Sequence, residues 1–160
     1  MNKRFFLPSL AMIAMTLTLL ITSCGSDDGV MPLPQKSNLF YQINSISSDM
    51  TAFYEMEVTY LDLEGTEHTE RIDGQSWAKK LNEGPVDARF RCVITARLKA
   101  EQPVVNRETY SFGYECKCSC YRPDLGVKDQ TNTMDETIES GQLQEWLNAH
   151  QQITICNFNF

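Results

Sequence analysis

Histidine is scarce in this sequence, and the motifs of the common catalytic classes are missing. The two histidines, His68 and His150, belong to no Ser/His/Asp or Cys/His motif. We interpret His68 as a surface residue of a strand and His150 as the residue that ends a helix. Gly-rich phosphate loops and zinc-protease motifs are absent as well. We therefore expect a protein that is not an enzyme and has no catalytic residue.

Basic residues are also in the minority, with 14 Lys and Arg against 21 Asp and Glu and a net charge of −7. Phosphate contacts require clustered Lys and Arg, so the balance argues against nucleic acid as a partner. It also argues against docking of a folded domain on anionic lipid. Four acidic residues share one polar segment but match no EF-hand spacing, so we expect no metal there: Asp124, Asp129, Asp135 and Glu136.

The first 24 residues form the clearest motif of the chain. A short basic start leads into an apolar segment, residues 5–21, and small residues then precede Cys24. This order is typical of a secretory signal. The alternative, a membrane-spanning helix, would be short at 17 residues and would contain Pro8, and no basic cluster follows it. We interpret residues 1–23 as a signal peptide.

The sequence Ile21-Thr22-Ser23-Cys24 resembles the lipobox of bacterial lipoproteins. The resemblance implies that Cys24 becomes the first mature residue, with a diacylglycerol on its sulfur and usually an acyl chain on its nitrogen. Each buried methylene contributes about 0.8 kcal/mol, so two or more chains anchor a protein stably. The expected membrane link is this covalent lipid on Cys24, and we expect no other cofactor.

Residues 24–28 are similar to the surface-export signal of Bacteroidota lipoproteins, in which serine and acidic residues follow the cysteine. A solvated spacer is the alternative for the two aspartates. Gly25 argues against retention in the inner membrane, so we expect the outer membrane and possibly the cell surface. Residues 24–37 have linker composition, which leaves residues 38–160 as a single domain. The mature chain carries 12 basic and 21 acidic residues, a net charge of −9.

Strand patterns dominate this domain. Apolar and polar residues alternate with period two, which is typical of half-buried strands. The segments are 39–43, 54–60, 66–72, 88–98, 110–120 and 153–160. Leu143, Trp146, Leu147 and His150 fall on one stripe of a short helix. Residues 76–82 fit a strand or a helical turn, and 123–137 reads as a surface loop. We predict a mainly β fold, an antiparallel immunoglobulin-like or transthyretin-like β-sandwich with one short C-terminal helix.

Part of this pattern resembles the soluble domain of the MmpS family, small mycobacterial membrane proteins with an immunoglobulin-like sandwich. The similar segments are Val58–Asp62, Gly65, Trp77, Lys79, Arg91–Ile94 and Cys116. The resemblance implies a sandwich fold, and a similar gap in that family separates two cysteines that pair. This chain has a lipid anchor in place of a membrane helix and carries extra cysteines. The family's role beside lipid and siderophore exporters is therefore not transferred.

Five cysteines remain besides Cys24, and cysteines of exported proteins more often form disulfides than bind metals. They are Cys92, Cys116, Cys118, Cys120 and Cys156. Alternate residues of one strand lie about 6.6 Å apart, near the limit for bridging. If 88–98 and 110–120 form a hairpin, Cys92 lies near Cys116, and Cys156 takes Cys118 or Cys120. The alternatives are a metal or redox site on the Cys116/Cys118/Cys120 face, and buried free thiols.

Three aromatic residues could face a ligand such as a glycan: Trp77, Tyr121 and Trp146. We expect Trp146 to anchor the helix to the sheet. Without a catalytic motif, the sequence favours a lipid-anchored envelope lipoprotein that acts as a non-enzymatic binding or structural module. Its partner would be an unknown envelope protein or glycan. Thiol-redox or metal handling and glycan binding at the cell surface are the two alternative functions.

Overall fold

The computed structural model describes residues 36–104 and 106–160. The predicted signal peptide, Cys24 and nearly all of the predicted linker lie outside the described residues. Within the described part of the chain, no helix has the length and hydrophobicity needed to cross a membrane.

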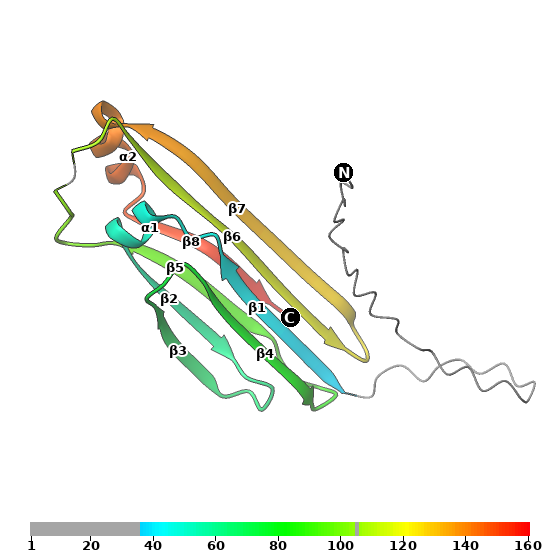
Figure 1. The fold of residues 1–160 in the computed structure, drawn as a ribbon. Helices are drawn as coiled ribbons and strands as arrows, with labels where there is room; N and C mark the ends of the chain where they lie inside the picture. The colour runs from blue at the N-terminus through cyan, green and yellow to red at the C-terminus, as the bar shows by residue number, and fades with distance from the viewer. Residues whose placement is uncertain (1–35, 105) are drawn as a thin grey trace, which may run out of the picture. The chain divides into compact units, whose positions relative to one another are not determined.

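Two antiparallel four-stranded sheets face each other across a shared core (Figure 1). The first sheet has the order β4-β1-β6-β7, from Trp77–Gly84, Ser37–Asn44, Thr109–Arg122 and Gly126–Glu139. The second has the order β3-β2-β5-β8, from Glu67–Ile72, Tyr54–Leu61, Arg91–Leu98 and Gln152–Asn159. The helices are α1 (Ser48–Phe53) and α2 (Leu143–Ala149), and a short 3₁₀ turn at Ser140–Gln142 precedes α2. The predicted mainly β antiparallel sandwich with a short C-terminal helix is confirmed.

The alternating residues of the strands fill the interior, as the period-two pattern predicts. Along β1, buried and half-exposed residues alternate without interruption. The largest buried side chains are aromatic and meet edge to face: Tyr41 packs against Phe158 at 5.9 Å between ring centroids, and Phe53 packs against Phe112 at 5.7 Å. Such pairs contribute beyond the area that they bury. The core is therefore built from rings contributed by both sheets.

Residues 123–137 are not a surface loop, which corrects the sequence-based prediction. Gly126 begins strand β7, and β7 pairs with β6 from Arg122 to Thr109 along its full length. The strand is polar on both faces because it lies at the edge of its sheet, where its inner face is only half covered. Gly126 adopts a positive φ of 68° in the turn before β7, a conformation that glycine tolerates without strain.

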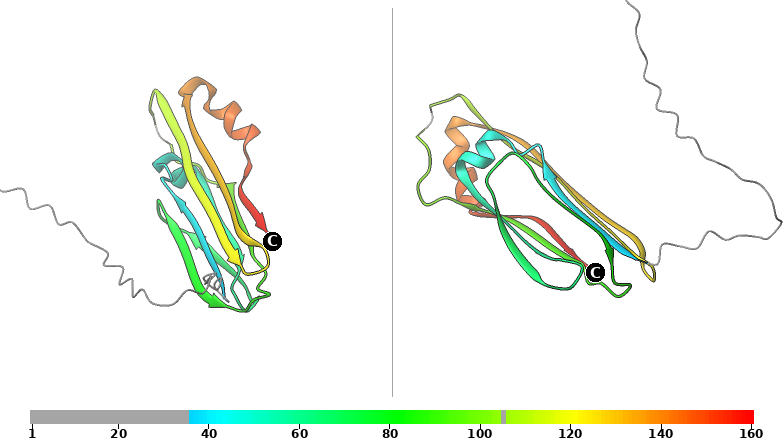
Figure 2. Two further views of the ribbon diagram at one scale, coloured as in Figure 1. Left: turned by 90° about the vertical axis from the view of Figure 1, so that its right-hand side faces the viewer. Right: turned by 60° about the horizontal axis from the view of Figure 1, so that its bottom comes forward.

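The chain crosses between the sheets where a hairpin was expected. Strand β5 pairs with β2 and β8, whereas β6 pairs with β1 and β7. The views of Figure 2 show another of the connections between the sheets, in which β7 leads through α2 into β8. Of the ambiguous segment 76–82, residues 77–82 form part of strand β4 and Ser76 precedes it. Helix α1 was not anticipated, although Ser47 and Asp49 form a recognisable helix start.

Helix α2 lies in the segment that connects β7 of one sheet to β8 of the other. The indole of Trp146 stacks on Phe112 of β6, with ring centroids 4.2 Å apart, and Leu147 is buried. Trp146 thus anchors the helix to the sheet, as the sequence predicts. His150 is the C-terminal capping residue of the helix, also as predicted, and its ring stacks on Trp146.

Candidate functional site

Cysteine side chains from both sheets meet in the core. Cys92 of β5, Cys118 of β6 and Cys156 of β8 are buried, and their sulfur atoms all lie within 4.8 Å of one another. We call these three residues the sulfur cluster. Among the described residues it is the one group of His, Cys, Asp or Glu side chains close enough together to share a metal ion.

A short contact in the sulfur cluster joins the two sheets. The Sγ atoms of Cys118 and Cys156 are 3.2 Å apart. The Cys156 thiol also lies 3.7 Å from the carbonyl oxygen of Cys92, within its own sheet. The structure therefore brings Cys156 to Cys118, one of its two expected partners. It does not place Cys92 opposite Cys116, because β5 and β6 belong to different sheets.

An irregularity in β8 directs Cys156 into the core. The pairing of β8 with β5 shifts register between Ile94 and Thr95, and this leaves Ile155 as an extra residue. A bulge of this kind re-aims the side chains that follow it. As a result the neighbouring residues Ile155 and Cys156 are both buried. The sequence carries a signal of this break, because the apolar residues change phase between Ile155 and Cys156.

The three cysteines of β6 are sealed from solvent. Cys116, Cys118 and Cys120 have 1%, 0% and 3% of their surface exposed. Burial raises the pKa of the Cys120 thiol to about 11. Hydrogen bonding to Cys118 and Cys156, together with burial, raises the pKa of Cys116. A reactive thiol needs both a low pKa and access to solvent, so this face does not have the properties of a redox site.

Cys156 differs from its neighbours in its electrostatic surroundings. Hydrogen bonds from the thiols of Cys116, Cys118 and Cys92 lower its pKa. Cys120 lies outside the sulfur cluster.

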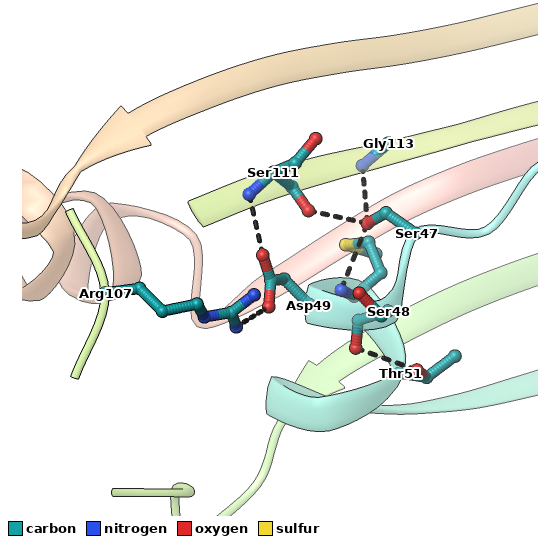
Figure 3. Close-up of polar contacts among 8 residues, drawn as sticks. Ser47, Ser48, Asp49, Thr51, Arg107, Ser111 and Gly113 are labelled. Atoms are coloured by element: carbon teal, nitrogen blue, oxygen red, sulfur yellow. Dashed lines mark hydrogen bonds and ion pairs between the residues drawn. The ribbon is translucent and has the colours of Figure 1, made fainter. Parts of the chain in front are cut away.

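A polar network surrounds the start of α1 (Figure 3). The Ser47 hydroxyl donates to the carbonyl of Ser111 at 2.7 Å and accepts from the amide of Gly113 at 3.0 Å. The buried carboxylate of Asp49 accepts from the amide of Ser111 at 2.7 Å and forms an ion pair with Arg107. We call Ser47, Asp49, Arg107, Ser111 and Gly113 the α1 network.

The α1 network replaces a missing strand. Strand β1 ends at Asn44, opposite Glu115 of β6, but β6 begins earlier, at Thr109. Buried backbone donors and acceptors need partners. Ser47 and Asp49 supply them with their side chains where β1 no longer runs beside β6. The network thus uses its polar groups within the fold, which assigns it a structural role.

The three candidate aromatic residues do not share a surface site. Trp77 is half-buried and donates from Nε1 to Glu70 at 2.8 Å. Trp146 donates from Nε1 to Glu136 at 2.8 Å while stacking on the core. Tyr121 lies on β6 opposite Asn38 of β1 and Val127 of β7. Each of the three rings therefore contacts different residues and lies at a different place in the fold.

His68 contributes to a turn and not to a group of catalytic residues. Its Nε2 lies 2.7 Å from the Asp62 carboxylate, and its ring stacks on Tyr60 at 5.2 Å. Asp62 also accepts from the backbone amides of Glu64 and Thr66. The hydrogen bond with His68, with smaller contributions from these two amides, lowers the pKa of Asp62. The pair fastens the β2–β3 turn.

The surface depressions are open to solvent. One lies beside α2 and is lined in part by Trp146 and His150, with a volume of about 310 Å³. Another lies between the β2–β3 and β4–β5 loops, near Leu63 and Arg89. Known small-molecule sites are enclosed and have a few polar groups that converge on the ligand.

No protein-family model, no curated protein sequence and no solved structure matches this chain.

Proposed function

We propose that this chain is a lipid-anchored lipoprotein of the cell envelope, and that its sandwich is a non-enzymatic binding or structural module. The observation that carries the proposal is the lipobox ending at Cys24 ahead of a sandwich whose first strand begins at Ser37. A fully extended chain rises at most about 3.6 Å per residue. The residues between Cys24 and Ser37 can therefore separate the domain from the bilayer by at most about 45 Å.

The sandwich itself supports the non-enzymatic part of the proposal. Among the described residues, the buried thiols lie in the core, the Asp62–His68 pair fastens a turn, and the Asp49–Arg107 pair belongs to the α1 network. Each has a role in holding the fold. A protein of this kind would act through its surface, by contact with another envelope component.

The expected location is the outer membrane, with the domain facing the periplasm or the cell exterior. Export would also expose the interior cysteines to oxidation during folding, and a disulfide among them belongs to the same proposal. The expected partner is an envelope protein or a glycan.

Lipid attachment is tested by growing cells that express the chain with an alkyne-bearing fatty acid, followed by coupling to a fluorescent azide. We expect label on the wild-type chain and on Cys120→Ala, a control that removes a different cysteine. Cys24→Ala should carry no label, keep its signal peptide and leave the outer-membrane fraction. Lipid label on Cys24→Ala, or an unlabelled wild-type chain, would contradict the proposal.

A further inference from the structure

We infer that Cys118 and Cys156 form a disulfide that joins the two sheets through the core. The inference rests on the proposed export, because an oxidising compartment supplies the conditions for the bond. It adds a specific covalent modification to the fold, and it leaves Cys92, Cys116 and Cys120 as thiols.

The distance between the two sulfurs is the first argument. They lie 3.2 Å apart, and a disulfide requires about 2.05 Å. Some Cα atoms of strands β6 and β8 lie within 8 Å of each other, a range that includes the 4.4–6.8 Å typical of disulfides. Formation of the bond requires the two sulfurs to approach by about 1 Å.

The neighbouring cysteines are less suitable partners. Cys116 and Cys118 are alternate residues of one strand, a spacing near the limit for bridging. Cys92 pairs with Phe158 in the sheet, whereas Cys156 pairs with Ile94, so these two cysteines are offset along adjacent strands. Cys120 lies outside the sulfur cluster. Cys116 interacts with Cys156 as well, but it lies outside the sulfur cluster. Cys118, whose Sγ lies 3.2 Å from that of Cys156, is therefore the best placed partner.

A disulfide also suits these surroundings better than a metal ion does. The residues paired with the three cysteines are Tyr41, Ile94 and Phe158, all fully buried. Three thiolates around one divalent ion would leave a net negative charge among these side chains. Burying a charge without a compensating partner is costly. A disulfide is neutral and needs no counter-charge.

The chemistry is thiol–disulfide exchange with a small or protein disulfide of the compartment. The Cys156 thiolate attacks that disulfide, forms a mixed disulfide and releases one external thiolate. The Cys118 thiolate then attacks the Cys156 sulfur and releases the second external thiolate. Two protein thiols are oxidised, one external disulfide is reduced, and the two protons of the protein thiols end on the two released external thiolates, which become thiols. Because Cys118 is fully buried, the exchange takes place before the two sheets close.

Peptide mapping tests the inference directly, because trypsin separates the relevant cysteines. Cleavage after Arg and Lys, but not before Pro123, places Cys92 in residues 92–97 and Cys116 in 108–117. Cys118 and Cys120 share residues 118–128, and Cys156 lies in 129–160. The full chain is taken from cell membranes, denatured in acid, blocked with N-ethylmaleimide at neutral pH in denaturant, and digested without reductant.

We expect 118–128 linked to 129–160, and blocked thiols on the peptides of Cys92 and Cys116. The linked pair should persist in Cys120→Ala and be lost in Cys118→Ala. Full blocking of all five cysteines, a link to another peptide, or zinc or copper bound to the native chain in its intact mass would overturn the inference.

A refolding experiment distinguishes a failure of the inferred disulfide from a failure of the proposed function. Reduced chain is unfolded in urea and refolded with oxidised glutathione, so that the bond can form without export. A link there, in a chain that carries no lipid in cells, would contradict the proposed location alone. A lipid-labelled chain that forms no link in either arm would contradict the disulfide alone.

Discussion

Replacing Asp49 with alanine should weaken the whole domain, although the residue lies in a helix of only six residues. The carboxylate accepts from the amide of Ser111 and pairs with Arg107, and its side chain is 3% exposed. Without it, the Ser111 amide loses its partner in a site that water does not readily reach. Leaving such a donor unsatisfied costs about 1–3 kcal/mol.

The ion pair adds less, because the Arg107 side chain is 42% exposed and solvent screens its charge. Exposed pairs contribute about 0–1 kcal/mol. We therefore expect Asp49→Ala to lower the free energy of unfolding by about 2–3 kcal/mol in total. For a domain of this size, such a loss lowers the melting temperature by about 6–12 °C.

Urea unfolding followed by tryptophan fluorescence measures the effect, since Trp77 and Trp146 both contact the core. Asp49→Asn is the matched control, because its amide oxygen can still accept from Ser111, and we expect it to lose only about 1 kcal/mol. The midpoint should shift with little change in the slope of the transition. The reasoning is refuted if Asp49→Ala stays within 0.5 kcal/mol of the wild type, or if both variants lose the same amount.

Three further substitutions test the core and its polar edge. Tyr41→Phe should raise the free energy of unfolding by about 1 kcal/mol in urea titrations, because the buried hydroxyl has no hydrogen-bond partner among the described residues. Gly84→Ala should cost about 1–3 kcal/mol in the same assay, since a Cβ there would lie 2.7 Å from side-chain carbons of Leu63. Glu70→Gln should flatten the loss of stability between about pH 5 and pH 3, because a hydrogen bond from Tyr60, above all, holds the pKa of Glu70 below 4.5 in the folded state. A carboxyl with a lowered pKa stabilises the fold above its unfolded pKa, and this contribution disappears as the pH falls through the folded value.

Matched controls make these results specific. Gly141→Ala places its Cβ in open space and should leave the unfolding midpoint unchanged. Glu115→Gln, on the exposed face of β6, should keep the wild-type pH dependence. A Tyr41→Phe variant that unfolds at lower urea, or a Gly84→Ala variant with wild-type stability, would contradict the packing described above. Equal acid sensitivity of Glu70→Gln and the wild type would contradict the role of Glu70.

The sequence predicts the strands that have one apolar and one polar face. It fails for a strand that is polar on both faces. Strand β5 carries Cys92, Ile94 and Ala96 inward, and its outward residues are polar except for Val93, so its period-two pattern is clear. Strand β7 has the polar residues Gln130 and Asn132 even on its inner face, because an edge strand is only half covered. Its alternation therefore carries little hydrophobic contrast, and the segment reads as a loop.

Strand pairing was harder to predict than strand position. Alternation shows which side of a strand faces the core, but it does not show in which sheet the strand lies. The pattern of β5 and β6 is compatible with a hairpin as well as with a crossing, and the difference decides which cysteines meet. Cys92 and Cys116 are close in a hairpin, whereas the crossing places Cys118 opposite Cys156. The composition of the sulfur cluster thus depends on topology that local patterns do not encode.

The position of the inferred disulfide fits a domain held by its N-terminal end. A lipid on Cys24 would transmit mechanical load to β1, which lies between β4 and β6 rather than at an edge. Cys118 pairs with Tyr41 of β1, so a bond to Cys156 would fix the neighbour of the loaded strand to the opposite sheet. The bond would close a loop of 38 residues, which corresponds to about 4 kcal/mol of chain entropy. This contribution would come at the centre of the sandwich, whereas the chain crossings through α1 and α2 join the sheets at their ends.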